Sequence, residues 1–146
     1  MRFRYAFQKI VDLKSNEKTQ AEWMLSQAMV KVREEEVTLS RLQQAKEEQE
    51  LELHRASTGT ITISEIMMRQ SFVQHFEKQI HLKSKELEQA RSVARLKQED
   101  LNGKMLQEKV WTKAKDRAYE RFSAQMLKRE QGELDEMATN RYRKLS

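Results

Sequence analysis

The chain of 146 residues contains no cysteine, no proline and only three glycines. Average proteins contain about 7% glycine and about 5% proline. Because turns and compact multi-loop domains depend on these two residue types, their scarcity excludes an all-β fold and a doubly wound α/β fold. The absence of cysteine excludes a disulfide framework and a thiolate metal site, and it fits a reducing compartment such as the cytoplasm.

Long apolar runs are missing as well. No run of eighteen apolar residues is available to span a membrane, and residues 1–20 lack the apolar core and cleavage site of a secretory signal. Hydrophobic residues make up 38% of the chain and charged residues 35%. This hydrophobic share is small for a globular core but sufficient to line one seam between two helices. We therefore expect an all-α fold in a single elongated domain over residues 1–146.

Both halves of the chain show apolar residues at alternating spacings of three and four, the pattern of helices that supercoil around each other. In the first half the seam positions are Phe7, Val11, Lys14, Lys18, Ala21, Leu25, Ala28, Val32, Glu35, Leu39, Leu42, Lys46, Gln49, Leu53 and Ala56. In the second half they are Ile66, Arg69, Val73, Phe76, Ile80, Lys83, Leu87, Ala90, Ala94, Lys97, Leu101, Lys104, Glu108, Trp111, Lys115, Ala118, Phe122, Gln125 and Arg129. The polar members of this seam predict a weak pairing for its length.

The seam pattern is interrupted at residues 57–60, where serine, threonine and glycine cluster. Thr62 is followed three residues later by Glu65, the spacing of a capping box at the start of a new helix, and Ser64 is an equally good N-cap. These signals predict a turn between the two halves. Gly103 interrupts a helical pattern that resumes after it, whereas Gly132 is the better candidate for a helix end or kink.

The predicted architecture is an antiparallel coiled-coil hairpin. Its first helix covers about residues 5–57, its turn about residues 58–63 and its second helix about residues 64–138, with a flexible C-terminal tail. At 1.5 Å per residue the helices are about 80 Å and about 110 Å long. The second helix therefore extends past the first, and Leu127 to Ala138 form an overhang.

The net charge of +5 is unevenly distributed. Residues 1–20 contribute +3 and residues 104–146 contribute +4, while residues 21–103 contribute −2. In a hairpin both basic segments lie at the open end. A basic segment is a candidate for nucleic acid or an anionic membrane surface, but interspersed acidic residues dilute the positive field, so we do not expect nucleic-acid binding.

Motifs that carry enzymatic chemistry are not found. Gly103 and Lys104 stand alone and do not form a phosphate-binding loop. His54, His75 and His81 have no cysteine to join them and do not share a helix face, so we expect solvated histidines and no metal site. Runs of carboxylates spread around a helix and do not form a dry catalytic pocket. We predict a protein that is not an enzyme and has no cofactor or small-molecule substrate.

An unusually dense apolar group follows the predicted turn. Its members are Ile61, Ile63, Ile66, Met67, Met68, Phe72 and Phe76. Phe72 lies one position off the seam, and Met68 precedes it by four residues on the same stripe. The group is either a docking patch or the apolar closure of the hairpin tip.

Aromatic and basic residues mix at the open end. Arg2, Phe3, Arg4 and Tyr5 open the chain, and Tyr119 is available on the second helix. We expect Phe7, Trp111 and Phe122 to form a small aromatic core there. The basic residues around this core remain available for an acidic partner surface.

The chain resembles the FliJ family of the flagellar type III export apparatus over its whole length. Three marks carry this resemblance. They are the opening Phe3-Arg4-Tyr5-Ala6-Phe7-Gln8-Lys9-Ile10-Val11-Asp12-Leu13, the length with its hairpin layout, and the ending Glu133-Leu134-Asp135-Glu136-Met137-Ala138. The resemblance implies a cytoplasmic stalk similar to the gamma subunit of rotary ATPases, peripherally associated with the inner membrane at the flagellar base. It also implies a role in flagellar biogenesis, and hence in motility and chemotaxis.

The resemblance further implies that the stalk binds the ring of the export ATPase FliI, promotes its assembly, contacts the export gate protein FlhA and handles export chaperones. The expected gate-binding residues are Leu42, Met68, Phe72 and Phe76. The expected ring-binding residues, all at the basic open end, are Arg2, Arg4, Arg141, Arg143 and Lys144. The chain departs from the family pattern at Ala45, Gln49, Gln79 and Lys83, where other members carry larger aromatic or different groups.

Two alternatives follow from the residues. The first is a generic coiled-coil scaffold, or a related stalk from a virulence secretion system or a rotary ATPase. The second is a basic nucleic-acid-binding helix pair, whose affinity falls steeply with salt.

Overall fold

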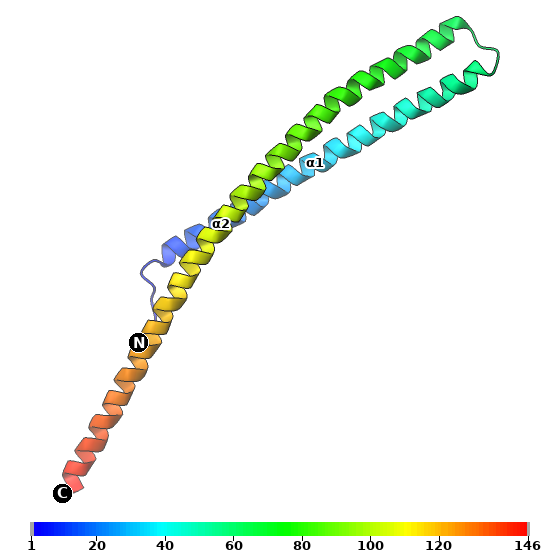
Figure 1. Cartoon of the computed structure of the whole chain (residues 1–146). Coiled ribbons are helices and arrows are strands. Elements are labelled where there is room, and N and C mark those ends of the chain that lie inside the picture. Colours follow the sequence, from blue (N-terminus) through cyan, green and yellow to red (C-terminus); the bar gives the residue numbers. More distant parts are fainter. Residues whose placement is uncertain (1, 146) are drawn as a thin grey trace. The chain divides into compact units, whose positions relative to one another are not determined.

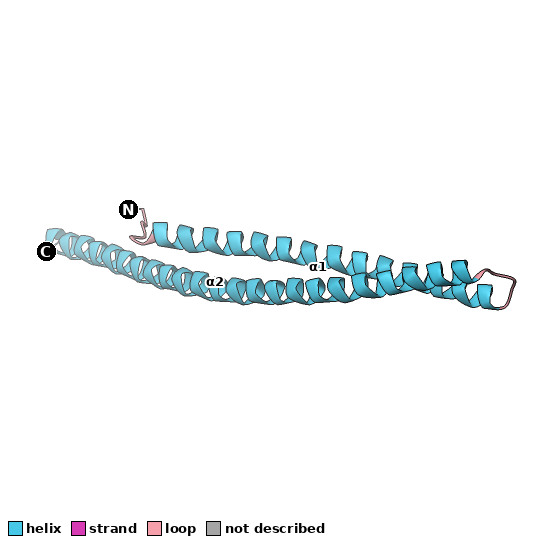
Figure 2. Cartoon of the chain, turned by 90° about the horizontal axis from the view of Figure 1, so that it is seen from above, coloured by secondary structure: helices cyan, strands magenta, loops and turns pink. Residues whose placement is uncertain are grey.

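The computed structural model describes residues 2–145, which form two long helices and no strand. Helix α1 spans Gln8–Ser57 and helix α2 spans Ile63–Leu145 (Figure 1). One loop joins the two helices and a second loop precedes α1 (Figure 2). This architecture confirms the predicted all-α fold with two long helices.

The chain divides into two compact units. The hairpin unit is Ala21–Leu101, which contains most of α1, the connecting loop and the first part of α2. The terminal unit is Met1–Gln20 together with Asn102–Ser146. We describe each unit by itself.

In the hairpin unit α1 and α2 run antiparallel. Lys46 of α1 lies 3.5 Å from Glu77, while Glu36, ten residues earlier on α1, lies 3.3 Å from Arg91, further along α2. The residue numbers of the contact partners thus rise along α2 as they fall along α1, which is the pattern of antiparallel helices. This direction is the one that a short connecting loop imposes on neighbouring helices.

The loop closes through local hydrogen bonds. The Ser57 and Thr58 hydroxyls donate to the carbonyl oxygens of His54 and Arg55 at 2.7 and 2.8 Å, which satisfies acceptors at the end of α1. At the start of α2 the Glu65 amide donates to the Thr62 hydroxyl oxygen at 3.3 Å. Thr62 is therefore the N-cap of α2. It is one of the two residues, Thr62 and Ser64, that the sequence offers for this role.

The seam is narrow, and its core consists of small and aliphatic residues. Among residues 2–145 the buried hydrophobic residues are Ala21, Leu87, Ala90 and Leu101, and all four belong to the hairpin unit. Every predicted seam position in this unit is buried or half-buried. The three-four spacing therefore identifies the packed face of both helices, since only side chains on that face meet the neighbouring helix.

The terminal unit begins with a non-helical segment, residues 2–7, that precedes α1. The predicted helix start near residue 5 lies three residues earlier than the observed one. The Phe3 ring packs against Tyr119 and Phe122 of α2, with ring centroids 5.3 Å apart in both pairs. We attribute the later helix start to this packing, which places the first residues against α2 (Figure 1).

The far end of α2 extends beyond its contacts with α1. All residues from 127 to 145 are exposed, which matches the predicted overhang. The helix continues to Leu145, whereas the sequence predicts an end near residue 138. Gly132 does not end the helix, because strong helix formers surround it and one glycine costs only about 1 kcal/mol relative to alanine. Flexibility of the tail stays a prediction.

Candidate interaction surfaces

The functional features of residues 2–145 are exposed surfaces and not enclosed binding sites. Residues 2–145 contain no group of three or more histidine or acidic side chains arranged to hold a metal ion. His54, His75 and His81 are all exposed. None of the described helices contains a stretch long and apolar enough to cross a membrane. Charged networks, exposed apolar residues and aromatic contacts are therefore the features to assess.

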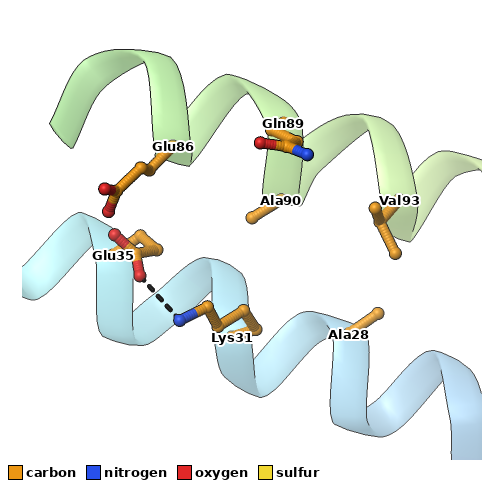
Figure 3. Close-up of a pocket in the computed structure, with 7 residues that line it drawn as sticks. All are labelled: Ala28, Lys31, Glu35, Glu86, Gln89, Ala90 and Val93. Carbon is orange, nitrogen blue, oxygen red and sulfur yellow. Dashed lines mark ion pairs between the residues drawn. The ribbon is translucent and has the colours of Figure 1, made fainter. Parts of the chain in front are cut away.

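The strongest electrostatic feature lies in the seam of the hairpin unit and centres on Glu35. This carboxylate is 5% exposed, and its two oxygens lie 2.9 Å from Lys31 Nζ and 3.0 Å from Lys83 Nζ. Lys83 also lies 2.8 Å from Glu86, so it bridges carboxylates of both helices. The network borders a hollow of about 280 Å³, which is open because Ala28 and Ala90 leave space between the helices (Figure 3).

The charges of this network hold one another ionised. Hydrogen bonds from Lys31 and Lys83 lower the pKa of Glu35 below its ordinary value of 4.5, against the opposing effect of desolvation. The Glu86 and Glu35 carboxylates raise the pKa of Lys83 above 10.5, and Glu35 raises that of Lys31. The network therefore remains fully charged near neutral pH. It links the two helices at one fixed register, the role best attested for buried polar groups.

The predicted gate-binding residues lie on two faces of the hairpin unit. Leu42 and Phe76 are half-buried in the seam. Met68 and Phe72, by contrast, are 50% and 45% exposed. The structure thus places Met68 and Phe72 where a partner can contact them, while Leu42 and Phe76 also hold the hairpin together.

The apolar group at the tip is only partly used to close the hairpin. Ile61, Ile66 and Phe76 are half-buried, whereas Ile63 and Met67 are 77% and 62% exposed. We call the exposed members Ile63, Met67, Met68 and Phe72 the tip patch. The four residues lie within one ten-residue stretch, and exposed apolar side chains of this kind are candidates for an interaction surface.

The seam beneath the tip patch is weakened by polar residues. Arg69 and Gln49 occupy seam positions, yet the buried Arg69 Nε and Gln49 Oε1 atoms have no hydrogen-bond partner among the described residues. Burial of an unpaired polar atom opposes folding. These polar atoms therefore oppose the pairing of the two helices at this part of the seam.

In the terminal unit aromatic rings connect the N-terminal segment to α2 in two groups. Phe3 contacts Tyr119 and Phe122, as described above. Phe7 lies 6.1 Å from Trp111 and 5.8 Å from Tyr5 between ring centroids, both in edge-to-face geometry. The expected aromatic contact between Phe7 and Trp111 is confirmed, but Phe7 is 51% exposed and belongs to a surface cluster rather than a buried core.

The predicted ring-binding residues fall into two clusters. Arg2 and Arg4 lie with Lys115 around a hollow of about 420 Å³ beside Phe3. Arg141, Arg143 and Lys144 are in the last turns of α2. Since Arg141 is nineteen residues beyond Phe122, the two clusters are separated by about 28 Å along this helix. The structure does not bring the five residues together into one patch, although all belong to the terminal unit.

The two units differ in charge. The terminal unit carries sixteen lysines and arginines against nine carboxylates, or +7, and the hairpin unit carries twelve against fourteen, or −2. The two basic segments of the sequence thus belong to one structural unit. This agrees with the expectation that they lie at the same end of a hairpin.

Sequence reasoning missed two features. It treated Glu35 only as a weakness of the seam, although Lys31 four residues earlier and a lysine in the facing seam could have revealed the network. It also overlooked apolar residues on the outer face of α1, among them Trp23, which is 63% exposed. A search for a second seven-residue repeat would have detected them.

Comparison with known proteins adds one finding. The family model described as "Flagellar FliJ protein" matches residues 3–145, nearly the entire chain. No curated protein and no solved structure is similar enough to the sequence to count as a match.

Proposed function

Because the chain belongs to the flagellar FliJ family, whose members are non-enzymatic components of the flagellar export apparatus, we propose that it is a non-catalytic stalk. In this proposal the terminal unit docks in the ring of the export ATPase FliI and promotes its assembly and activity. The tip patch contacts the export gate protein FlhA. The stalk couples the two partners and handles export chaperones.

The charge of the terminal unit is the observation that carries this proposal. A net +7 on one unit creates a field that attracts an acidic partner and speeds its encounter. Arg2 and Arg4 are exposed beside Lys115 and can each form charge-assisted hydrogen bonds with partner carboxylates. The exposed end of α2 adds a second set of cations that a ring can surround.

The tip patch supplies a different kind of contact. Phe72 and Met68 are exposed and apolar, so their burial against a partner removes apolar surface from water without opening the seam. Methionine adapts its shape to an irregular partner surface. We expect these two residues to contribute most of the gate contact, with Leu42 and Phe76 supporting them from the seam.

The proposed location follows from the proposed partners. A stalk that joins an ATPase ring to a membrane gate works in the cytoplasm, at the inner membrane beneath the flagellum, and reaches the membrane through protein contacts. Its loss would abolish flagellar assembly. Motility, and with it chemotaxis, would then fail.

ATP hydrolysis by the cognate FliI tests the ring contact. We expect the protein to stimulate hydrolysis. Two variants should stimulate less, Arg2→Gln with Arg4→Gln, and Arg141→Gln with Arg143→Gln and Lys144→Gln. The matched control, Lys78→Gln with Lys85→Gln, removes two exposed cations from the hairpin unit and should stimulate normally.

Failure of a helical, monomeric preparation to stimulate FliI would contradict the stalk proposal. Equal losses in the Lys78 and Lys85 control would also contradict it, because the effect would then reflect total charge and not the terminal unit. Screening by salt should weaken the stimulation, since the contacts are between exposed charges.

A further inference from the structure

The seam of the hairpin unit determines which residues of α1 face away from α2. In a two-helix coiled coil one position of each seven-residue repeat lies farthest from the seam. On α1 this outermost position is occupied by Trp23, Val30, Val37, Gln44 and Leu51. The apolar members are 63%, 43%, 49% and 50% exposed in that order. We call Trp23, Val30, Val37 and Leu51 the outer stripe.

Helix α2 provides an internal comparison. Its outermost positions in the same unit are Ser71, Lys78, Lys85, Ser92 and Glu99, all of them polar. A polar outer face is what a solvated helix pair requires. At this outermost position of the repeat, α2 is therefore polar and α1 is mostly apolar. Folding of the hairpin does not need the outer stripe, because its side chains point away from the seam.

The surface around the outer stripe contains a hollow and carries positive charge. A shallow hollow of about 420 Å³ lies on α1 beside Val30 and Val37 and is bordered by Arg33 and Arg41. Both arginines are exposed, and neither has a carboxylate partner among the described residues. Glu34 lies between them and leaves a net positive charge at this hollow. Unpaired guanidinium groups favour a partner that presents carboxylates.

The spacing of the outer stripe indicates the shape of its partner. Apolar residues at seven-residue intervals over about 42 Å of helix match the repeat of another helix that packs alongside. Trp23, the most exposed member of the outer stripe, is of the residue type that most often anchors protein interfaces. We propose that the outer stripe docks an amphipathic helix of a partner protein, with apolar residues repeating every seven positions and flanking carboxylates that pair with Arg33 and Arg41.

This contact is separate from the ring and gate contacts proposed above. The outer stripe lies on α1 in the hairpin unit, whereas the ring contact uses the terminal unit and the tip patch lies at the start of α2. The stalk could therefore hold a third protein while it contacts both partners.

A synthetic peptide tests the proposal directly. The probe is a 28-residue helix of four repeats with leucine at two positions of each repeat and glutamate at the flanking positions, so that its copies repel one another. The chain contains two tryptophans, and Trp111→Phe leaves Trp23 as the only one. We expect the peptide to shift the Trp23 fluorescence to shorter wavelength in a saturable manner, as burial removes the indole from water.

Three comparisons make the test specific. Val30→Glu with Val37→Glu should weaken peptide binding at least about tenfold, because two carboxylates then face the apolar side of the peptide. Ser71→Glu with Ser92→Glu adds the same charge to the outer face of α2 and should leave binding unchanged. A peptide with lysine in place of glutamate should bind at least about tenfold more weakly, as should the Arg33→Gln with Arg41→Gln variant.

Circular dichroism should show the same helix content in every variant, since the substituted residues lie outside the core. Absence of a saturable shift would overturn the proposal, and so would equal binding of the lysine peptide or equal loss in the Ser71 and Ser92 variant. Sedimentation of the unmodified protein as a dimer that Val30→Glu with Val37→Glu dissociates would also overturn it. The occupant would then be a second copy of this chain.

Discussion

Glu35 shows how one polar seam residue links the two helices of the hairpin unit. Its carboxylate is nearly inaccessible to solvent and contacts a lysine from each helix. A carboxylate in such a position is tolerated only when both of its oxygens have cationic or hydrogen-bonding partners. The network therefore favours one register of the helix pair over alternatives that would leave Glu35 buried without a lysine.

Acid should weaken the contribution of Glu35 to the stability of the folded protein. The pKa of Glu35 is lowered in the folded protein, so its stabilising effect is present above the ordinary carboxyl pKa of 4.5 and is lost as the pH falls below that value. We expect Glu35→Gln to lower the unfolding temperature at pH 7 and the difference from the unmodified protein to shrink between pH 4.5 and pH 3. Thermal unfolding followed by circular dichroism measures this.

The control for this prediction is Glu48→Gln, which neutralises an exposed carboxylate with no ion pair among the described residues. It should change the unfolding temperature little at any pH. If the unfolding temperatures of Glu35→Gln and the unmodified protein differ by a constant amount down to pH 3, the assigned role of Glu35 is wrong.

The two glycines of α2 offer a second test at this scale. A Cβ atom added at Gly103 or Gly132 would meet no atom within 4 Å, and neither residue has a positive φ. We expect Gly103→Ala and Gly132→Ala each to stabilise the helix by about 0.5 to 1 kcal/mol, because alanine loses less backbone entropy on folding. For Gly103→Ala, urea titration should show a higher free energy of unfolding. For Gly132→Ala, amide hydrogen exchange in the surrounding helix should be slower. Destabilisation by Gly103→Ala would mean that this position needs a conformation other than the helix.

At the scale of the elements, the end of α2 is a helix without a neighbour from α1. Its residues 127–145 are all exposed, including Leu134 and Leu145, so this segment contributes little burial to folding. We expect removal of residues 127–146 to leave the unfolding midpoint of the remaining protein within about 1 °C, since surface changes away from packed features have small effects on stability. Differential scanning calorimetry measures the midpoint.

The same truncation should lower FliI stimulation, because it removes Arg141, Arg143 and Lys144. A drop of several degrees in the unfolding midpoint would contradict the described exposure of this segment. It would indicate that the segment packs against another part of the protein in solution.

The elements were largely predictable from the sequence because their determinants are local. The three-four spacing identified the packed faces, and the capping signals at Thr62 and Ser64 predicted the start of α2 to within about a residue. The helix start was less predictable, since Phe3 is positioned by rings more than a hundred residues away in sequence. Spacing along α1 could reveal only the Lys31 and Glu35 pair of the network, because its second lysine, Lys83, comes from the opposite helix.

The candidate surfaces were predictable to a smaller extent. Sequence spacing placed Phe72 off the seam, and the structure shows it exposed. Spacing could not show that the proposed ring-binding residues form two clusters, since that depends on where Phe3 places Arg2 and Arg4 along α2. The outer stripe was not predicted because its residues repeat every seven positions on the face opposite the seam, outside the three-four spacing.

At the scale of the whole molecule, the chain combines a basic terminal unit with a slightly acidic hairpin unit that carries the tip patch. The family assignment places it in the flagellar export apparatus. A protein that contacts two partners through two chemically different surfaces can lose either contact separately. This separation of the two contacts is the central claim of the account.

The most direct test measures both contacts on two variants. One is Arg2→Gln with Arg4→Gln in the terminal unit, and the other is Met68→Ser with Phe72→Ser in the tip patch. Leu96→Ser, which alters a 64% exposed apolar residue elsewhere on α2, serves as the control. FliI stimulation and binding to the soluble part of FlhA are measured for each protein.

We predict that the arginine variant loses FliI stimulation and binds FlhA normally, while the tip-patch variant binds FlhA at least about tenfold more weakly and stimulates FliI normally. Leu96→Ser should retain both. If each variant instead loses both activities to the same extent while remaining helical, the two surfaces do not act separately and the account is wrong.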